Sequence, residues 1–490
     1  MDRDQLLMLP PSMRDWLPAG HLALLVEDVV AQMDTSALHG RGRRGGVGRA
    51  GYDPDMLLGL LVYGYAQAVH SSRKIEARCE TDVAFRYLCA QDVPDHTVIA
   101  RFRRGHAAAL AGLLTEVLVV AVRLGMGRFG HLAIDGTKIA ANASKDANRD
   151  VAGLRKLAGS LVADSIAVDD AEDTEHGDRR GDELPPSVRD RSGRRQRIAE
   201  ALAKAEAAEQ AADGPRRAAQ ARLAAAETRL VERVAQAQGA DAAWQARRDA
   251  DGICPPGRKA GPIQRRPPVA RAAQAVEKAQ ARLAAVTDKP TRAARANLTD
   301  PDSRLLPTRH GQWVQGFNSQ LVVSDDYLVT AVAIHDNPND AAAFVPLMHT
   351  ATATVATLAA RTGTDLSITL ITADAGYDTD TNLTTAGPDR LIAQADRHTT
   401  ATAARDQPTS GPPPPQATAR QQMAHRLRSP EGHTAYKRRA ATVEPVHSHL
   451  KNQIGLRQYQ LRGIAGATIE LTLAAIAHNI RRLHTHQATA

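Results

Sequence analysis

The feature that most constrains the fold is the segment 144–302, which interrupts the chain between two regions that contain strand signals. This segment is rich in Ala, Arg, Asp, Glu and Gln and nearly free of aromatic residues. Its apolar positions are mostly Ala, which buries little area, so a second globular core is disfavoured. We expect two or three long charged helices, arranged for example as an antiparallel coiled-coil hairpin. Loosely ordered flanks are expected around 165–190 and 254–268.

Composition excludes membrane and secreted classes. A chain of 490 residues predicts two or three domains. The most apolar stretch, Ala107–Gly127, is broken by Glu116 and Arg123, so it does not predict a spanning helix. The first residues, Met-Asp-Arg-Asp, lack the positive charge of a signal peptide. The 3 cysteines match no metal spacing and are expected to be reduced thiols in a cytoplasmic protein.

Residues 1–128 predict a helical module. Asp53-Pro54 and Asp95 are helix-cap signals. In the helix after Asp95, Val98, Ile99 and Phe102 are expected to face the core. The bases Arg101, Arg103 and Arg104 are expected on the exposed side, which suits contact with DNA. A packing helix with a solvated basic face is the alternative. The Gly/Arg loop 40–49 is either a second DNA contact or a solvated loop.

The remaining chain predicts an α/β core. Strands are expected at 131–141, at 312–325 and 327–335 as a hairpin, at 367–373 and at 391–394. Continuous apolarity in 367–373 is typical of a strand buried on both faces. Helices are expected at 340–361 and 433–453, with a polar linker over 397–430. A final helix has an apolar stripe at 4-3-4-3 spacing: Ile469, Leu473, Ile476, Ile480 and Leu483.

Three carboxylates stand where catalytic acids are found. Asp135 and Asp374 each follow strand residues and precede small residues, at the strand ends where α/β proteins bind ligands. Each could instead cap a turn. Glu444 is the only acid between Tyr436 and Arg462, among six Lys and Arg, and shares a helix face with Lys451. Three such carboxylates can hold two Mg²⁺ ions for phosphoryl displacement, with the bases on the DNA backbone.

Other polar residues predict structural roles. His447-Ser-His449 lacks the Cys or acid pair that would complete a zinc site. Turn and cap positions are expected for Asp300, Asp302, Asp336 and Asp340, and His131 is interpreted as structural.

The order of motifs resembles the bacterial insertion-sequence DDE transposases of the IS-four and IS-five-like superfamily. The matching motifs are Asp135-Gly-Thr-Lys138, Gln315-Gly-Phe-Asn318, Asn337-Pro-Asn-Asp340, Asp374-Ala-Gly-Tyr377, Tyr436…Arg439…Glu444…Lys451 and Leu473–Ile480. The run Tyr52–Arg104 resembles the InsH-like N-terminal domain of such enzymes. One departure is His447, where the family often has an aromatic residue.

The resemblance implies three parts. Residues 1–128 would be an all-α DNA-binding domain. Residues 129–143 and 303–490 would be an RNase H-like catalytic domain, a mixed sheet flanked by helices, with Asp135 on the first strand, Asp374 on the fourth and Glu444 on a following helix. Residues 144–302 would be a helical or partly disordered insertion.

The resemblance also implies the chemistry. Asp135, Asp374 and Glu444 would bind two Mg²⁺, with Mn²⁺ as a substitute. Water would attack a phosphodiester at the element end, and the freed 3′-hydroxyl would attack target DNA. Arg439 and Lys451 would contact phosphate, and Tyr436 would help to place the flanking strand. The partner would be double-stranded DNA, bound by a homodimer or higher oligomer at the nucleoid. A catalytically inactive DNA-binding regulator and a metal-dependent nuclease without strand transfer remain as alternatives.

Overall fold

The computed structural model describes residues 12–40, 51–159, 186–251, 261–287, 294–308 and 311–489. The chain divides into two compact units. Unit 1 comprises Met1–Ala147 and Thr299–Ala490, and unit 2 comprises Asn148–Leu298. Unit 2 thus covers nearly the same residues as the segment 144–302.

Helices form the first part of unit 1, as the sequence predicts. They are α1 (Leu22–Gln32), α2 (Ser36–His39), α3 (Pro54–Ala66), α4 (Ser72–Thr81), α5 (Val83–Leu88), α6 (His96–Gly105) and α7 (Ala107–Arg123). Both predicted caps are confirmed. The Asp53 side chain accepts from the Asp55 N–H at 3.0 Å, and Asp95 accepts from the Thr97 N–H at 2.7 Å. The Gly/Arg loop lies outside the described residues, apart from Gly40.

A six-stranded sheet forms the centre of unit 1. Its strands are β1 (His131–Ala140), β4 (Arg304–Pro307), β5 (Trp313–Ser324), β6 (Val329–His335), β7 (Leu370–Ala373) and β8 (Asp389–Ile392). They lie in the order β4-β5-β1-β7-β8, and β6 pairs with β5. β5 runs antiparallel to β1 and β6, whereas β7 is parallel to both β1 and β8. The predicted hairpin is β5–β6. The strand predicted to be buried on both faces is β7, in which the consecutive residues Ile371, Thr372 and Ala373 are all buried.

The strands alternate with helices in the second part of unit 1. These helices are α11 (Phe344–Thr362), α12 (Asp380–Thr384), α13 (Arg397–Asp406), α14 (Ala419–Arg428), α15 (Pro430–Asn452) and α16 (Gly463–Thr489). The prediction of a polar linker over 397–430 is wrong, because α13 and α14 lie there. Thr418 and Gln421 form a reciprocal capping box at the start of α14. Met423 and Leu427 bury its apolar side against Leu391.

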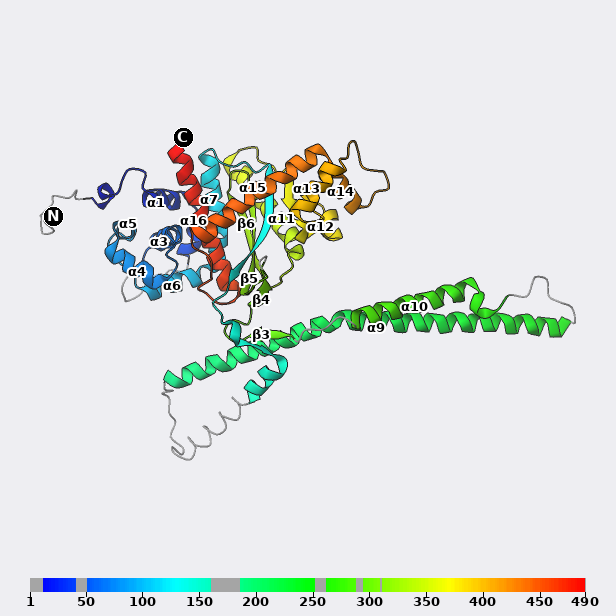
Figure 1. Cartoon of the computed structure of the whole chain (residues 1–490). Coiled ribbons are helices and arrows are strands. Elements are labelled where there is room, and N and C mark those ends of the chain that lie inside the picture. Colours follow the sequence, from blue (N-terminus) through cyan, green and yellow to red (C-terminus); the bar gives the residue numbers. More distant parts are fainter. Residues whose placement is uncertain are drawn as a thin grey trace, which may run out of the picture. The chain divides into compact units, whose positions relative to one another are not determined.

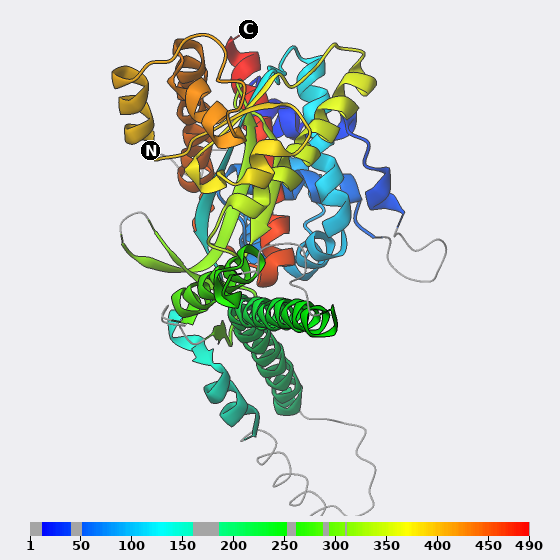
Figure 2. The same cartoon turned by 90° about the vertical axis from the view of Figure 1, so that its right-hand side faces the viewer.

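One hydrophobic core joins the N-terminal helices to the sheet. Buried residues of α1, α3 and α7 belong to the same cluster as those of β1, β5 and α16. The predicted stripe of α16 is buried, and this helix packs against α1, α3, α7 and β6. Figures 1 and 2 show α16 running between the N-terminal helices and the sheet.

Two described helical stretches, Ala341–Thr362 and Gly463–Thr489, are long and apolar enough to span a membrane. Helices α6 and α7, which are bent relative to each other, would give a third such stretch if they formed a single span. The apolar window of Gly463–Thr489 is 78% buried inside the protein. Its composition is therefore explained by packing at the centre of unit 1.

Unit 2 contains a long helical hairpin, as predicted. α9 (Pro186–Asp251) and α10 (Pro267–Thr287) lie side by side in both views (Figures 1 and 2). Strands β2 (Asn148–Asp150) and β3 (Arg295–Asn297) pair antiparallel where the chain enters and leaves the unit. Of the predicted loose flanks, residues 165–185 and 254–260 lie outside the described residues. The remainder is helical in part, because residues 186–190 belong to α9 and residues 261–268 contain the 3-10 helix Ile263–Arg265 and the start of α10, so loose structure was wrongly predicted there.

Candidate active site

The two predicted aspartates lie side by side where β7 ends. In the parallel pair β1–β7, Ile134 lies opposite Ala373, so Asp135 and Asp374 directly follow paired residues. Asp374 follows the end of β7 as predicted, whereas Asp135 lies within β1, which continues to Ala140. Asp135 is only 5% exposed. Burial raises the pKa of the Asp374 carboxyl, and the neighbouring Asp135 carboxylate raises it further. The structure therefore places two like charges close together in a poorly solvated site, as a cation site requires.

Helix α15 covers this pair with basic side chains. Arg439 is 5% exposed, and its Nη1 lies 3.2 Å from Asp135 Oδ2. His447, two turns further along, places Nε2 at 3.7 Å from the same oxygen. Tyr436 is buried and hydrogen-bonds to the Arg439 side chain. Burial lowers the pKa of Arg439, but the carboxylates of Asp135 and Asp374 more than offset this and raise it. Arg439 is thus held as a cation against Asp135.

A further carboxylate, that of Asp340, lies behind the two aspartates. Its Oδ1 accepts hydrogen bonds from Asn318 Nδ2 and Gln320 Nε2, both at 2.6 Å. A Cβ on Gly136 would lie 2.8 Å from Asp340 Oδ1, and a Cβ on Gly376 would lie 3.1 Å from Asp340 Oδ2. The Asp340 carboxylate therefore fits between the two glycines that follow the aspartates.

Asp340 occupies a cap position, as predicted, directly before the short helix Ala341–Ala343, but its side chain makes no cap hydrogen bond and serves the site instead. The sequence did carry a signal. The β5–β6 hairpin pairs Asn318 with His335, which brings Gln315-Gly-Phe-Asn318 and Asn337-Pro-Asn-Asp340 together. Two polar motifs at the open end of one hairpin predict such a contact.

The third predicted acid, Glu444, is positioned differently. Its side chain is 51% exposed, and Oε1 lies 3.8 Å from Arg397 Nη1 on α13. Lys451, on the same face of α15, donates to Thr137 Oγ1 on β1. The structure thus brings Asp135, Asp374 and Arg439 together, whereas Glu444 pairs with α13.

Two family models match the chain. Residues 11–105 match a model described as a transposase domain (DUF772), and residues 405–484 match a model described as a transposase DDE domain. Both matches are to transposase domains, and together they support an insertion-sequence DDE transposase. The second match includes Glu444 and the basic residues of α15. No curated protein and no solved structure gave a significant match.

As a transposase, the chain needs DNA-contacting residues, and α6 lies within the first match. The prediction that Arg103 lies on the exposed side is wrong. Its side chain is 5% exposed, donates from Nη1 to the His70 carbonyl at 3.0 Å, and lies 3.7 Å from Glu470 on α16. Because Ile99 and Phe102 are also buried, Arg103 lies beside the core face of α6. Arg101 and Arg104 are exposed, as expected.

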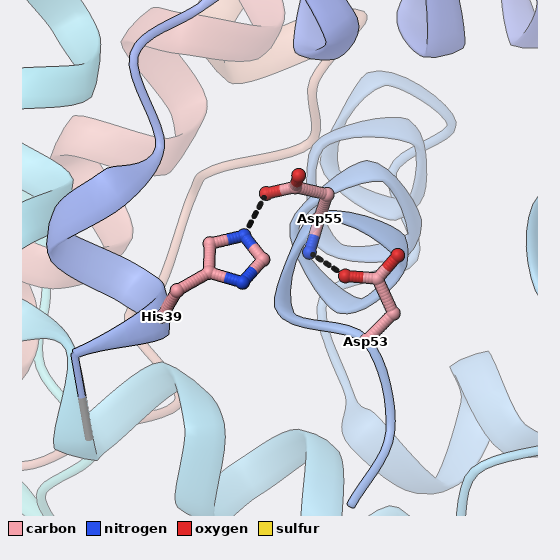
Figure 3. Close-up of side chains that lie close together, drawn as sticks. All are labelled: His39, Asp53 and Asp55. Atoms are coloured by element: carbon pink, nitrogen blue, oxygen red, sulfur yellow. Dashed lines mark hydrogen bonds and ion pairs between the residues drawn. The ribbon is translucent and has the colours of Figure 1, made fainter. Parts of the chain in front are cut away.

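Other titratable clusters in the transposase have structural explanations. Figure 3 shows that His39 pairs with Asp55, and Asp53 caps α3. Glu76, Asp95 and His96 form a similar group around the cap of α6. All of these side chains remain at least partly exposed, and their contacts account for the arrangement.

The histidines and remaining aspartates are structural, as the sequence predicts. His131 is buried between Asp325, at 2.7 Å, and Thr372, at 2.9 Å. His449 and His478 form a pair with 2.9 Å between their Nδ1 atoms, and burial lowers their pKa values to about 4 and about 3. Asp300 and Asp302 accept from the N–H groups of Gly463 and Ile464 at the start of α16.

A pocket of 280 Å³ lies between α13 and α15, and its lining includes Arg439, which contacts Asp135. Two further cations, Arg397 and Lys437, line it together with Tyr436 and with His433, whose pKa is lowered by burial. A basic pocket next to an acidic pair suits a phosphate-bearing chain that approaches a cation site.

Proposed function

We propose that this transposase cuts DNA at the ends of an insertion sequence and joins the freed 3′ ends to target DNA by in-line phosphoryl transfer. The observation that carries the proposal is the pair of carboxylates, Asp135 and Asp374, on neighbouring parallel strands. The strand order supports an RNase H-like catalytic domain. If the short strand β4, which pairs only with residues 313–316 of β5, is left aside, the order β6-β5-β1-β7-β8 reads 3-2-1-4-5 in chain order, and only the second of these five strands runs against the first.

The donor set fits divalent magnesium, with two ions expected and Mn²⁺ as a substitute. The ligands are carboxylate oxygens, and both burial and the neighbouring Asp135 carboxylate raise the pKa of Asp374, an effect that a bound cation would oppose. Asp135, Asp374 and Glu444 would hold the metal. When bound, Mg²⁺ would stabilise the attacking and leaving oxygens of the displacement. The 3.8 Å contact of Glu444 with Arg397 is too long for a hydrogen bond and half exposed, so it holds Glu444 only weakly.

The basic residues of α13 and α15 would bind the DNA strand. Arg397 and Lys437 line the pocket that contains Arg439, and Lys451 lies next to Thr137 on β1, the strand that carries Asp135. Arg439 would balance the charge of Asp135 and contact phosphate near the cleaved bond. Tyr436 lines the same pocket and would help to place the flanking strand. Arg101 and Arg104 on α6 would contact element ends.

We place the protein in the IS-four and IS-five-like superfamily, acting on DNA as a homodimer or higher oligomer. Its transposase domains suggest a cytoplasmic protein, and association with the nucleoid follows from DNA binding. The division into a DNA-binding part (1–128), a catalytic part (129–143 and 303–490) and an insertion (144–302) is part of the proposal.

A strand-transfer assay tests the proposal. The substrate is a duplex that carries the inverted repeats flanking the gene, either intact or pre-cut to a 3′-hydroxyl end. We expect cleavage and joining by the wild type in Mg²⁺, and loss of both in Asp135→Asn, Asp374→Asn and Glu444→Gln with end binding retained. Cleavage without joining would identify a nuclease, and binding without either would identify a regulator. If one of these variants keeps near wild-type cleavage, the substituted residue is not a metal ligand.

A further inference from the structure

The helical hairpin of unit 2 carries an arginine-lined groove. At the start of α10, Arg266 bonds Asp241 through both carboxylate oxygens at 2.6 and 2.7 Å and donates to the Ala237 carbonyl at 3.1 Å. These contacts fix the antiparallel register of α10 on α9. Between the two helices runs a groove of 850 Å³ with a floor largely of alanines.

Four arginines line this groove. Arg222, Arg229 and Arg233 come from α9, and Arg271 faces them from α10. At about 100° per residue, the three positions on α9 fall within an arc of about 40°, so they form one stripe along the helix. All four residues are exposed. Glu232 is the only acid in the lining.

The four guanidinium groups lack anionic partners. Arg233 donates to the Gln236 side-chain oxygen, and Arg271 donates to the Pro267 carbonyl, both of which are neutral. Within the described part of the chain, none of the four forms an ion pair. Some other arginines of unit 2 are paired, since Arg155 pairs with Glu206, Arg217 with Asp213 and Arg266 with Asp241. The four groove arginines are distinguished by their position, because they line a single groove that contains one acid.

We propose that this groove binds the phosphate backbone of double-stranded DNA, so that the insertion is a DNA-holding arm; the inference rests on the proposed function. Guanidinium groups match phosphate geometry and stay charged at any cellular pH. The stripe from Arg222 to Arg233 spans 11 residues, or roughly 16 Å of helix. That length covers about five phosphates at about 3.4 Å per strand. Such contacts hold DNA without reading its sequence.

The test compares two full-length variants with equal loss of charge. The groove variant is Arg222→Gln/Arg229→Gln/Arg233→Gln/Arg271→Gln. The control variant is Arg216→Gln/Arg217→Gln/Arg247→Gln/Arg248→Gln, which changes exposed arginines of α9 outside the groove. The measurement is affinity for a duplex, with and without an element end, as a function of salt. Circular dichroism checks that the helical content is equal.

Each lost phosphate contact lowers the slope of log K against log salt by about 0.9. We expect the groove variant to lose roughly 3 in slope for both duplexes, and the control variant to lose less than 1. Equal slopes in the two variants would overturn the inference. A groove variant that changes only in oligomeric state would also overturn it and would indicate that the groove binds a second copy of the chain. If the wild type shows no salt-dependent DNA binding, the proposed function itself fails.

Discussion

At the level of single residues, Asp340 links the segments that carry the two aspartates. Its Oδ1 accepts from Asn318 and Gln320 on β5, and both oxygens approach the glycines next to Asp135 and Asp374. Gly136 leaves the space for this arrangement, because a Cβ there would lie 2.3 Å from Gln320 Nε2. The absence of a side chain at Gly136 is therefore a packing requirement of the site.

This geometry predicts different outcomes for two substitutions at Asp340. Asp340→Ala removes the acceptor of two buried amides and should lower strand transfer roughly 10- to 100-fold, as loss of groups that orient metal ligands usually does. Asp340→Asn keeps an oxygen acceptor and should stay within several-fold of the wild type. Mg²⁺ titration of the rate and Mn²⁺ affinity by electron paramagnetic resonance measure the effect. If Asn were as damaging as Ala, the carboxylate would act through its charge instead.

The residues of the site differ in how well sequence predicts them. Asp135 and Asp374 are predictable because an acid after an apolar strand is a local signal. Asp340 depends on the β5–β6 pairing, which sets two distant motifs side by side. Arg103 was placed on the wrong side because its charge was weighed above its helical position, four residues after Ile99 and therefore on the core face. Glu470, the buried acid that lies near it, is on a different helix.

At the level of elements, the contact of α6 with α16 is an ion pair inside the core. Glu470 is fully buried, and its Oε1 is 3.7 Å from Arg103 Nη1, beyond hydrogen-bond distance. Its Oε2 accepts from the Gln460 N–H at 2.7 Å. Burial raises the pKa of Glu470 from 4.5 to about 7. The Gln460 N–H and Arg103 lower this pKa, but their effects are smaller than that of burial. The pair thus incompletely offsets the cost of burying the carboxylate.

This raised pKa predicts how stability depends on pH. Because the folded state holds the proton more tightly, the contribution of Glu470 is complete below about pH 4.5 and is lost as pH rises through about 7. The loss is roughly 3 kcal/mol at about 1.4 kcal/mol per unit. Glu470→Gln should flatten the fall of the urea midpoint between pH 5 and pH 8. A fall as steep as in the wild type would assign the pH dependence to other groups.

Helices α13 and α14 show the limit of prediction at this scale. Their sequences are polar and contain prolines nearby, so hydrophobic periodicity gives little signal. Each begins with a side-chain cap, at Asp396 and at Thr418, and α14 adds only two buried residues, Met423 and Leu427. Capping residues therefore mark these helices better than periodicity does, but they were not used in the prediction, which placed a linker there. By contrast, β5, β6, β7 and α16 were predicted because their apolar patterns match their burial.

At the level of the whole molecule, unit 1 has one core rather than two. The buried faces of α3 and α7 pack against α16, which lies near the end of the chain. A fragment of residues 1–128 should therefore expose this apolar surface and unfold without a cooperative transition. Thermal unfolding followed by circular dichroism, compared with the full chain, checks this. A sharp transition in the fragment would show that the helical module folds alone.

Recognition of element ends should consequently be tested in the full chain. Arg101→Gln/Arg104→Gln should reduce the preference for an element end over random DNA in a competition shift assay at physiological salt. Arg123→Gln, an exposed arginine on α7, serves as the control. If the double variant keeps the full preference, α6 does not read the element end.

Unit 2 should be removable, because its own residues form its core and its ends lie together. Val151, Leu154, Ala201, Ala205 and Ala296 pack with one another. In the β2–β3 pair Asn148 lies opposite Asn297, and Cα atoms of such pairs are about 5 Å apart. A short Gly/Ser linker in place of residues 148–298 can therefore join Ala147 to Thr299 without stretching unit 1.

We expect this deletion variant to be soluble, to unfold cooperatively and to retain metal-dependent cleavage at high protein concentration. Its DNA affinity should depend less on salt, with a slope lower by at least the change seen in the groove variant, since the arginines of that groove are gone. Loss of cooperative unfolding in the deletion variant would show that unit 2 completes the fold of unit 1.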